Sequence, residues 1–352
     1  MRLISRIASV MFVASLSLGA VACGGGGDDS TGDDQPPVDY TGTDYQYVVD
    51  HISMPTTANE ANMLGLNLDD DPQGRPDNAL GQILSTLAGQ AGGSFNLQES
   101  IDTQLAEGQI ILLENIKTKS FTTATGVGAW VFLGANPSNA PCTDANDMVC
   151  GHHLDGSTSF DIDSTSPDDA LLSGQLVGGK FTGGPGSVTI EISLVSGNNT
   201  GIIVNLVGAK MEISSAADGS LMGGRLGGAV TEQALNDDIL PALHTILADT
   251  ISKDCTATTA PCCTDGSTGQ LLIDLFDESD PQDCMVTLDE LKNNSLISSL
   301  LAPDVDLFDG DPADGVYAPR KDGVKDSLSL GIGFTAVGAT FDLPATVTTP
   351  PQ

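Results

Sequence analysis

The sequence predicts an α+β protein, built mainly from an antiparallel β sandwich or roll with a helical insertion. Three observations support this prediction. Short segments rich in Val and Ile alternate with turn sequences such as Gly197-Asn198-Asn199 and Asp218-Gly219. The chain has 41 glycines but only 4% aromatic residues, which favours sheets with tight turns. After residue 230 the apolar residues change to the spacing of a helix.

The first elements are a strand and two helices. Residues 45–54 include Tyr-Gln-Tyr-Val-Val and predict a strand, and an acidic loop follows at 67–78. In residues 79–91 the apolar positions recur at the spacing of one helix face: Leu80, Ile83, Leu84 and Leu87. A second helix is indicated by the apolar residues Leu97, Ile101 and Leu105.

From Gly108 onward the pattern is that of strands. The expected strands are 109–116, 127–133, 188–195, 202–207, 209–214 and 221–230. A sandwich, a barrel-like roll and a broad antiparallel sheet all produce such a pattern. We therefore predict a β-rich domain over residues 45–230, with short N-terminal helices and the architecture of a sandwich or roll.

Residues 231–300 form the predicted helical insertion. One helix face is outlined from Asn236 onward by Ile239, Leu240, Leu243, Ile246, Leu247 and Ile251. Further helices are expected at 270–276 and 288–301. Residues 301–352 then hold an acidic loop and strands near 327–341, which we expect to rejoin the β-rich domain.

The N-terminus has the marks of export. Arg2 and Arg6 precede an apolar run that is shorter than the roughly 20 residues of a membrane span. The sequence Ala20-Val21-Ala22-Cys23 resembles the lipobox of bacterial lipoproteins. This resemblance implies a signal peptide over residues 1–22, lipidation of Cys23, and attachment to the membrane through that lipid. The alternative is an ordinary signal peptide in which Cys23 has no role.

Residues 23–44 are expected to be a flexible tether, because they are rich in Gly, Asp and Pro. Gly24 follows the cysteine where Asp would retain an enterobacterial lipoprotein at the inner membrane, so the resemblance favours the outer membrane or cell surface. The formal net charge of −34 makes nucleic acid and anionic lipid surfaces poor partners, and we expect no nucleic-acid partner. A protein or glycan at the cell surface is the further partner that we consider.

Six cysteines remain after Cys23, an even number that predicts disulfides in an oxidising compartment. Cys142 and Cys150 close a short loop and are expected to pair. The other four are Cys255, Cys262, Cys263 and Cys284, and the adjacent pair should each reach one of the outer two. A zinc site is the alternative, but paired Cys-x-x-Cys sequences are missing.

The acidic residues predict calcium. Of the 47 acids, 38 are Asp, a residue typical of turns and calcium loops. Residues 275–291 resemble an EF-hand, with Asp277, Asp280, Asp283 and Glu290 as the implied metal ligands. The span from Asp277 to Glu290 is 14 residues, two longer than the standard loop, and Cys284 lies near the place of the expected glycine. The alternative is a capping box alone, with Thr287 as the N-cap and Glu290 as its partner.

Two further loops alternate acids in the same way. The loop 67–78 resembles the calcium loops of dockerins and thrombospondin-type repeats, which implies oxygen ligands from Asn67, Asp69, Asp71 and Asp77. The loop 304–315 offers Asp309, Asp311 and Asp314. A helix cap at residues 77–78 and plain Asp-Gly turns are the respective alternatives.

No motif of a known catalytic site is present, neither Gly-x-Ser-x-Gly nor His-Glu-x-x-His nor a phosphate loop. The lipobox, the Gly/Asp tether and the Asp-rich loops together resemble surface lipoproteins of myxobacteria. The sequence thus predicts a non-catalytic, lipid-anchored envelope protein with structural Ca²⁺. The alternatives are a surface adhesin or glycan-binding module and an envelope hydrolase.

Overall fold

The computed structural model describes residues 40–90, 97–143, 147, 150–192, 202–312 and 315–348. The described residues all belong to one compact unit. The predicted signal peptide, Cys23 and the turn at 197–199 lie outside the described residues, as does Asp314.

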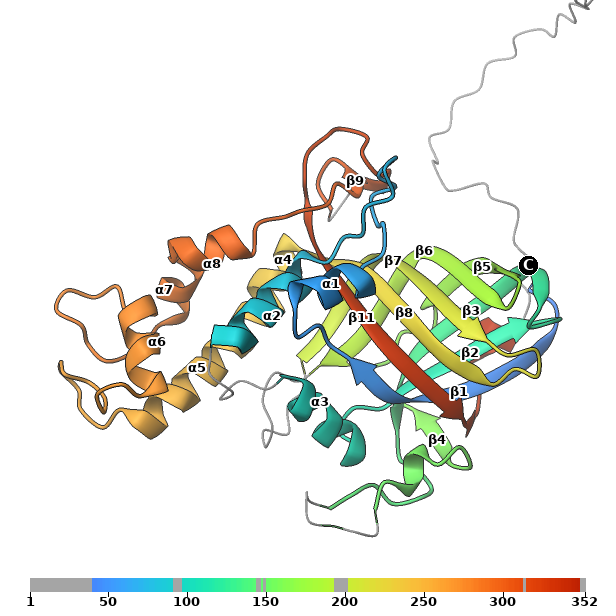
Figure 1. Ribbon diagram of the computed structural model, residues 1–352, viewed down its shortest axis with the longest axis horizontal. Helices are drawn as coiled ribbons and strands as arrows, with labels where there is room; N and C mark the ends of the chain where they lie inside the picture. The colour runs from blue at the N-terminus through green and yellow to red at the C-terminus, as the bar shows by residue number, and fades with distance from the viewer. Residues whose placement is uncertain are drawn as a thin grey trace, which may run out of the picture. The chain divides into compact units, whose positions relative to one another are not determined.

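The centre of the fold is a closed barrel of eight antiparallel strands (Figure 1). The order around the barrel is β1-β11-β8-β7-β6-β5-β3-β2, and β2 pairs with β1 to close it. The barrel strands are β1 (Thr43–Ser53), β2 (Leu112–Thr118), β3 (Thr123–Ala135), β5 (Leu171–Val177), β6 (Lys180–Ile192), β7 (Ile202–Ser215), β8 (Leu221–Thr231) and β11 (Ser327–Gly338).

The predicted sandwich or roll is therefore wrong. The ring is closed by β5, which pairs with β6 on one side and with β3 on the other, from Thr123↔Val177 to Trp130↔Leu171. The sequence of β5 has Ser-Gly-Gln at its centre, and β6 begins Lys-Phe-Thr-Gly-Gly-Pro-Gly. Neither β5 nor the first half of β6 is rich in Val or Ile, so β5 was not predicted and β6 was predicted only from residue 188 onward. Without the pairing of β5 with β3 and β6, the strand pattern has two open edges, as a sandwich does.

Register shifts help the sheet to curve. One lies in β7 between Val207 and Lys210, around Gly208 with its left-handed φ of 58°. A bulge of this kind increases the local twist and bends the strand. The two predicted strands 202–207 and 209–214 are consequently one strand, β7.

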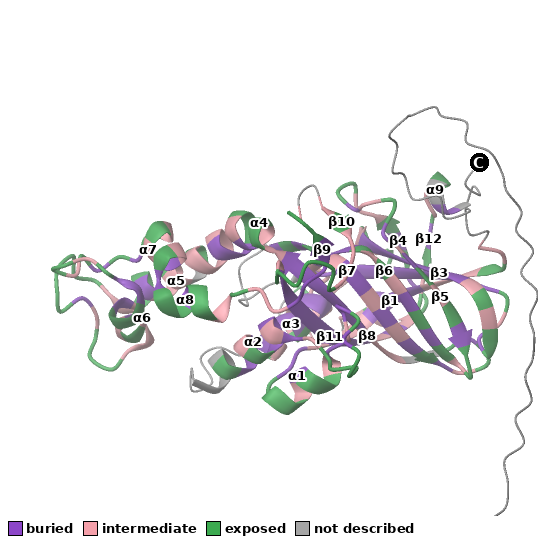
Figure 2. Cartoon of the chain, turned by 90° about the horizontal axis from the view of Figure 1, so that it is seen from above, coloured by how far each residue is buried: buried purple, intermediate pink, exposed green. Residues whose placement is uncertain are grey.

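Side chains pack the interior of the barrel, and the barrel strands carry many buried residues, drawn purple in Figure 2. Inward positions carry mainly aliphatic residues and Phe, among them Leu112, Val131, Leu172, Phe181, Ile190, Met211, Leu226, Ile332 and Phe334. Glycines make room for the rings, because a Cβ added at Gly183 or Gly224 would lie 2.3 or 2.4 Å from Phe181 or Phe334.

Helices complete this core. The predicted helices α2 (Ala79–Gln90) and α3 (Leu97–Ala106) are confirmed, and they contact β11 and β1 respectively. Leu84, Ile101 and Leu105 belong to the same apolar cluster as the barrel interior. The short α1 (Ala58–Leu64) lies against the outer face of β11, where Gly331 and Gly333 leave room for it.

The segment after β8 is helical, as predicted. It consists of α4 (Glu232–Ala234), a π-helical turn η2 (Leu235–Ile239), α5 (Leu240–Asp254), α6 (Thr268–Phe276), α7 (Leu288–Asn293) and α8 (Ser295–Leu300). Helices α5 to α8 enclose a second apolar cluster, which includes Leu240, Ile273, Val286 and Leu291. Leu235 and Ile239 of η2 belong to the barrel core, so η2 joins the two clusters along the chain.

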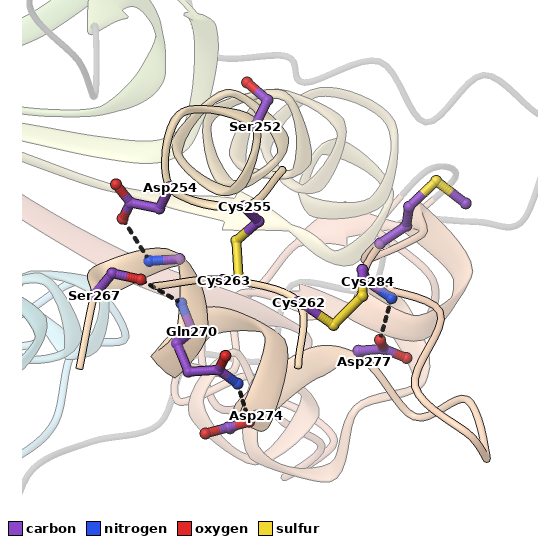
Figure 3. Close-up of a disulfide and its surroundings, with 12 residues drawn as sticks. Ser252, Asp254, Cys255, Cys262, Cys263, Ser267, Gln270, Asp274, Asp277 and Cys284 are labelled. Atoms are coloured by element: carbon purple, nitrogen blue, oxygen red, sulfur yellow. Dashed lines mark hydrogen bonds between the residues drawn. A yellow bond between two sulfur atoms is a disulfide. The ribbon is translucent and has the colours of Figure 1, made fainter. Parts of the chain in front are cut away.

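Three disulfides are present, and the pairings agree with the sequence prediction. They are Cys142–Cys150, Cys255–Cys263 and Cys262–Cys284. Cys255–Cys263 joins the C-terminal end of α5 to the turn that follows it, and Cys262–Cys284 joins that turn to the loop after α6 (Figure 3).

The remaining elements are short. They are η1 (His152–Leu154), β4 (Ser159–Ile162), the pair β9 (Phe308–Asp309) and β10 (Val316–Tyr317), β12 (Thr340–Phe341) and α9 (Ala345–Thr348). Strand β4 pairs with the end of β3 and with β12. Among the described helices, none has the length and apolar character needed to cross a membrane.

Candidate calcium site in the EF-hand-like loop

The EF-hand-like loop lies between α6 and α7. Helix α6 ends at Phe276, and Thr287 is the N-cap of α7. Thr287 and Glu290 form the predicted capping box: the Thr287 hydroxyl accepts from Glu290 N–H, and Glu290 Oε2 accepts from Thr287 N–H at 2.8 Å. One carboxylate oxygen of Glu290 is thus committed to the helix cap.

The other Glu290 oxygen turns toward the start of the loop. Glu290 Oε1 accepts from the Ser279 hydroxyl at 3.1 Å and from Glu278 N–H at 3.3 Å. Ser279 N–H donates to Asp277 Oδ1 at 3.0 Å. The carboxylates of Asp277 and Glu290, which are the two ends of the loop, therefore converge on one residue, Ser279.

Cys284 takes the conformation that a calcium loop usually obtains from glycine. Its φ is 66°, in the left-handed region that non-glycine residues rarely adopt. Two contacts hold it there: the disulfide to Cys262, and a hydrogen bond of 3.0 Å from Cys284 N–H to Asp277 Oδ2 (Figure 3). A covalent bond and a carboxylate thus stabilise the turn that glycine would make at no steric cost.

The other two predicted ligands of this loop are placed differently. Asp283 is exposed, and its Oδ1 accepts from Met285 N–H at 3.1 Å, within its own turn. Asp280 is exposed as well. The loop thus brings together Asp277 and Glu290 but neither Asp280 nor Asp283.

The surroundings of Glu290 favour its ionised form, which is the form that binds a metal ion. Burial would raise the pKa of the Glu290 carboxyl, but hydrogen bonds from Thr287, Ser279 and Glu278 hold the pKa below its usual value. Glu290 is consequently ionised at neutral pH. Within the described residues, no three His, Cys, Asp or Glu side chains gather closely enough to hold one metal ion. A cation in this loop would need Ser279 and main-chain carbonyls besides the two carboxylates.

The first acidic loop is hydrogen-bonded to itself and to basic side chains of the chain. Asn67 Oδ1 and Asp69 Oδ1 both accept from Asp71 N–H. Asp69 Oδ2 accepts from Arg320 Nη1 at 2.9 Å, and Asp71 Oδ2 accepts from Arg75 Nε. The hydrogen bond from Arg75 holds the pKa of Asp71 below its usual value.

Lys210 of β7 also reaches this loop. Its Nζ lies 2.6 Å from Asp70 Oδ1 and donates to Asn67 O at 2.8 Å. Asp77 instead accepts from Leu68 N–H at 2.7 Å. Burial raises the pKa of Asp77 to about 6, against the effect of that hydrogen bond and with the charge of Asp69 adding to it.

The third loop, 304–315, is followed by Arg320, which contacts Asp69 of the first loop and has a left-handed φ of 59°. Asp309 forms an ion pair with Lys321 at 3.5 Å, and Asp311 also has an interaction partner. Asp306 is buried and accepts from Gly323 N–H through Oδ2 at 2.8 Å, and within the described part of the chain its Oδ1 has no hydrogen bond.

Sequence reasoning missed that these two loops meet and that the chain supplies cations to them. Arg320 lies 251 residues from Asp69, and Lys210 lies 140 residues from Asp70. Neither basic residue is part of a local motif, so only the fold shows the contacts. The EF-hand-like loop 277–290 is accordingly the better candidate for a metal ion.

The histidines give no sign of a transition-metal pair. His153 is buried, with Nε2 2.8 Å from Leu105 O, and burial lowers its pKa. The adjacent His152 is exposed. His51 pairs with Asp102 at 3.3 Å, and both side chains are nearly half exposed.

Comparison of the chain with models of protein families, with curated proteins and with solved structures finds no match. A functional proposal therefore depends on the residues of this chain.

Proposed function

We propose that this protein is a non-catalytic, lipid-anchored protein of the bacterial cell envelope, in which loop 277–290 binds structural calcium. The observation that carries the calcium part is the convergence of Asp277 and Glu290 on Ser279. These two residues lie at opposite ends of the loop.

The positions along the loop support this proposal. Cys284 precedes Glu290 by six residues, as the invariant glycine precedes the closing Glu of a standard loop. Its left-handed backbone supports this correspondence. The two extra residues then fall between Ser279 and Asp283.

This alignment gives a donor set suited to calcium. Asp277, the Ser279 hydroxyl and the bidentate Glu290 would hold the ion together with the Met285 carbonyl, and Asp283 would join by turning inward. All of these donors are oxygens, which calcium prefers, and soft sulfur or nitrogen ligands are not part of the set. The sulfur of Cys284 is bonded to Cys262 in a disulfide.

The envelope part of the proposal is supported by the N-terminal sequence and by the cysteines. Ala20-Val21-Ala22-Cys23 resembles a lipobox, and three disulfides suit an oxidising compartment. Cell fractionation tests it: the native protein should enter the membrane fraction, and Cys23→Ser should release it. Recovery of both forms in the soluble fraction would contradict the anchor.

Calorimetric titration of the Cys23→Ser protein with CaCl₂ tests the calcium site. We expect a Kd of about 10⁻⁴–10⁻³ M, the range of extracellular calcium modules. Glu290→Gln is the informative variant, because Gln also completes a capping box but offers no bidentate carboxylate. Calcium binding should be lost while the helix cap is retained.

The matched control is Asp289→Asn, which removes an equal charge from the exposed neighbouring position. It should bind calcium as the unmutated protein does. Equal calcium binding by Glu290→Gln and the unmutated protein would show that Glu290 is a cap residue only.

A further inference from the structure

His244 connects helix α5 to the EF-hand-like loop. Its Nε2 lies 2.8 Å from the main-chain oxygen of Val286, which is 42 residues later in the sequence. His244 is half-buried, and Val286 is buried in the apolar cluster of the helical segment. Because a carbonyl only accepts, the imidazole donates through an Nε2–H.

The accepting carbonyl belongs to the peptide group that joins Val286 to Thr287. The N–H of the same peptide group donates to Glu290 Oε2 at 2.8 Å. One rigid planar peptide group thus accepts a hydrogen bond from His244 at its oxygen and donates one to Glu290 from its nitrogen. Hydrogen bonds arranged in such a chain polarise and strengthen one another.

We propose that His244 is a positioning residue for calcium binding, which acts on Glu290 through the Val286–Thr287 peptide group. This inference rests on the proposed calcium site. The Cys262–Cys284 disulfide holds the loop on one side of Met285, and His244 holds it on the other. The Met285 carbonyl and the Glu290 carboxylate therefore both depend on the orientation that His244 maintains.

The helix that contains His244, α5, is connected to the barrel core through the preceding turn η2. α5 follows directly on η2, whose Leu235 and Ile239 pack in the barrel core. The contact thus links the calcium loop to an element that is continuous with the barrel. Calcium binding should accordingly order the segment from 240 to 254 as well as the loop itself.

The test compares two substitutions in the Cys23→Ser protein by calcium titration. His244→Phe keeps a planar ring but has no donor, whereas the amide nitrogen of Gln in His244→Gln replaces the Nε2 donor. We expect His244→Phe to weaken calcium binding about five- to tenfold, the effect of one lost hydrogen bond. His244→Gln should restore most of the affinity, and the exposed neighbour in Thr245→Ala should leave it unchanged.

Melting in EDTA separates positioning from a purely structural role. A purely structural role would lower the melting temperature of His244→Phe without calcium and leave the calcium Kd unchanged, which would overturn the proposal. If His244→Phe does not fold, His244→Asn serves instead, because its shorter amide cannot reach Val286. Failure of the unmutated protein to bind calcium would overturn the proposed function and this inference with it. Normal binding by both the unmutated and the His244→Phe proteins would overturn this inference alone.

Discussion

Glu114 is a carboxyl group enclosed in the apolar interior of the barrel. It lies on β2 between the inward-facing Leu112 and Ile116, and neither of its oxygens has a hydrogen-bond partner among the described residues. It borders a cavity of about 20 Å³ lined otherwise by apolar side chains, among them Val131, Met211, Leu226, Ile332 and Phe334. Burial raises the pKa of Glu114 from 4.5 to about 8, so the carboxyl is neutral at pH 7.

This pKa makes the free energy of unfolding fall as the pH rises. Between pH 4.5 and about 8 the unfolded chain loses the Glu114 proton and the folded chain keeps it. The unfolded state then binds fewer protons, and stability declines by about 1.4 kcal/mol per pH unit. Over the whole interval the loss is about 5 kcal/mol, as an order of magnitude. The stability that Glu114 contributes in its neutral form is fully present below pH 4.5, and it is lost by the time the pH passes 8.

Two substitutions isolate this effect. Glu114→Gln has a similar shape and cannot ionise, and Glu114→Met fills the space with an apolar chain of similar volume. Urea unfolding followed by the fluorescence of Trp130, the only tryptophan and a buried barrel residue, measures the stability. The difference between Glu114→Gln and the unmutated protein should grow steadily from pH 5 to pH 8.

Above pH 8 that difference should level off, and Glu114→Met should be the most stable form, because it leaves no unsatisfied polar group. Parallel stability curves for the three proteins from pH 5 to pH 8 would refute the reasoning. They would mean that Glu114 ionises equally in the folded and unfolded chains.

Further predictions concern the loop contacts. Arg320→Met removes the cation that pairs with Asp69. Because the pair is only partly buried, the free energy of unfolding should fall by about 1–2 kcal/mol in urea titrations. An unchanged unfolding midpoint would count against this contact. Replacing Cys262 and Cys284 together by Ser opens a link between residues 22 apart and should cost about 3 kcal/mol. The same double variant should weaken calcium binding, whereas replacing Cys255 and Cys263 by Ser should not; equal calcium affinities in calorimetry would show that the Cys284 turn needs no disulfide.

The sequence predicted local structure better than closure of the sheet. Helices α2 and α3 were predictable because their apolar residues recur at a single spacing. The barrel was not, because β5 carries Ser-Gly-Gln at its centre and its strand character comes from pairing with β3 and β6. Inward and outward residues alternate in the same way in a sandwich and in a barrel, so alternation alone does not distinguish them.

In the candidate site, too, the local features could be predicted from the sequence and the long-range contacts could not. The capping box of Thr287 and Glu290 and the turn at Cys284 follow from residues close together in the sequence. The contacts made by Arg320 and His244 do not, because each joins segments that only the fold brings together. A local acidic pattern therefore shows where oxygens alternate, but not which cation they meet.

The most direct test of the calcium site is a crystal structure of the protein with millimolar CaCl₂. We expect one calcium ion between Asp277, Ser279 and Glu290, with oxygen distances of about 2.3–2.6 Å. Both Glu290 oxygens should face that ion, and Thr287 should remain the N-cap of α7. A loop that keeps Glu290 Oε1 on Ser279 at that calcium concentration, with no ion beside it, would contradict the proposed site.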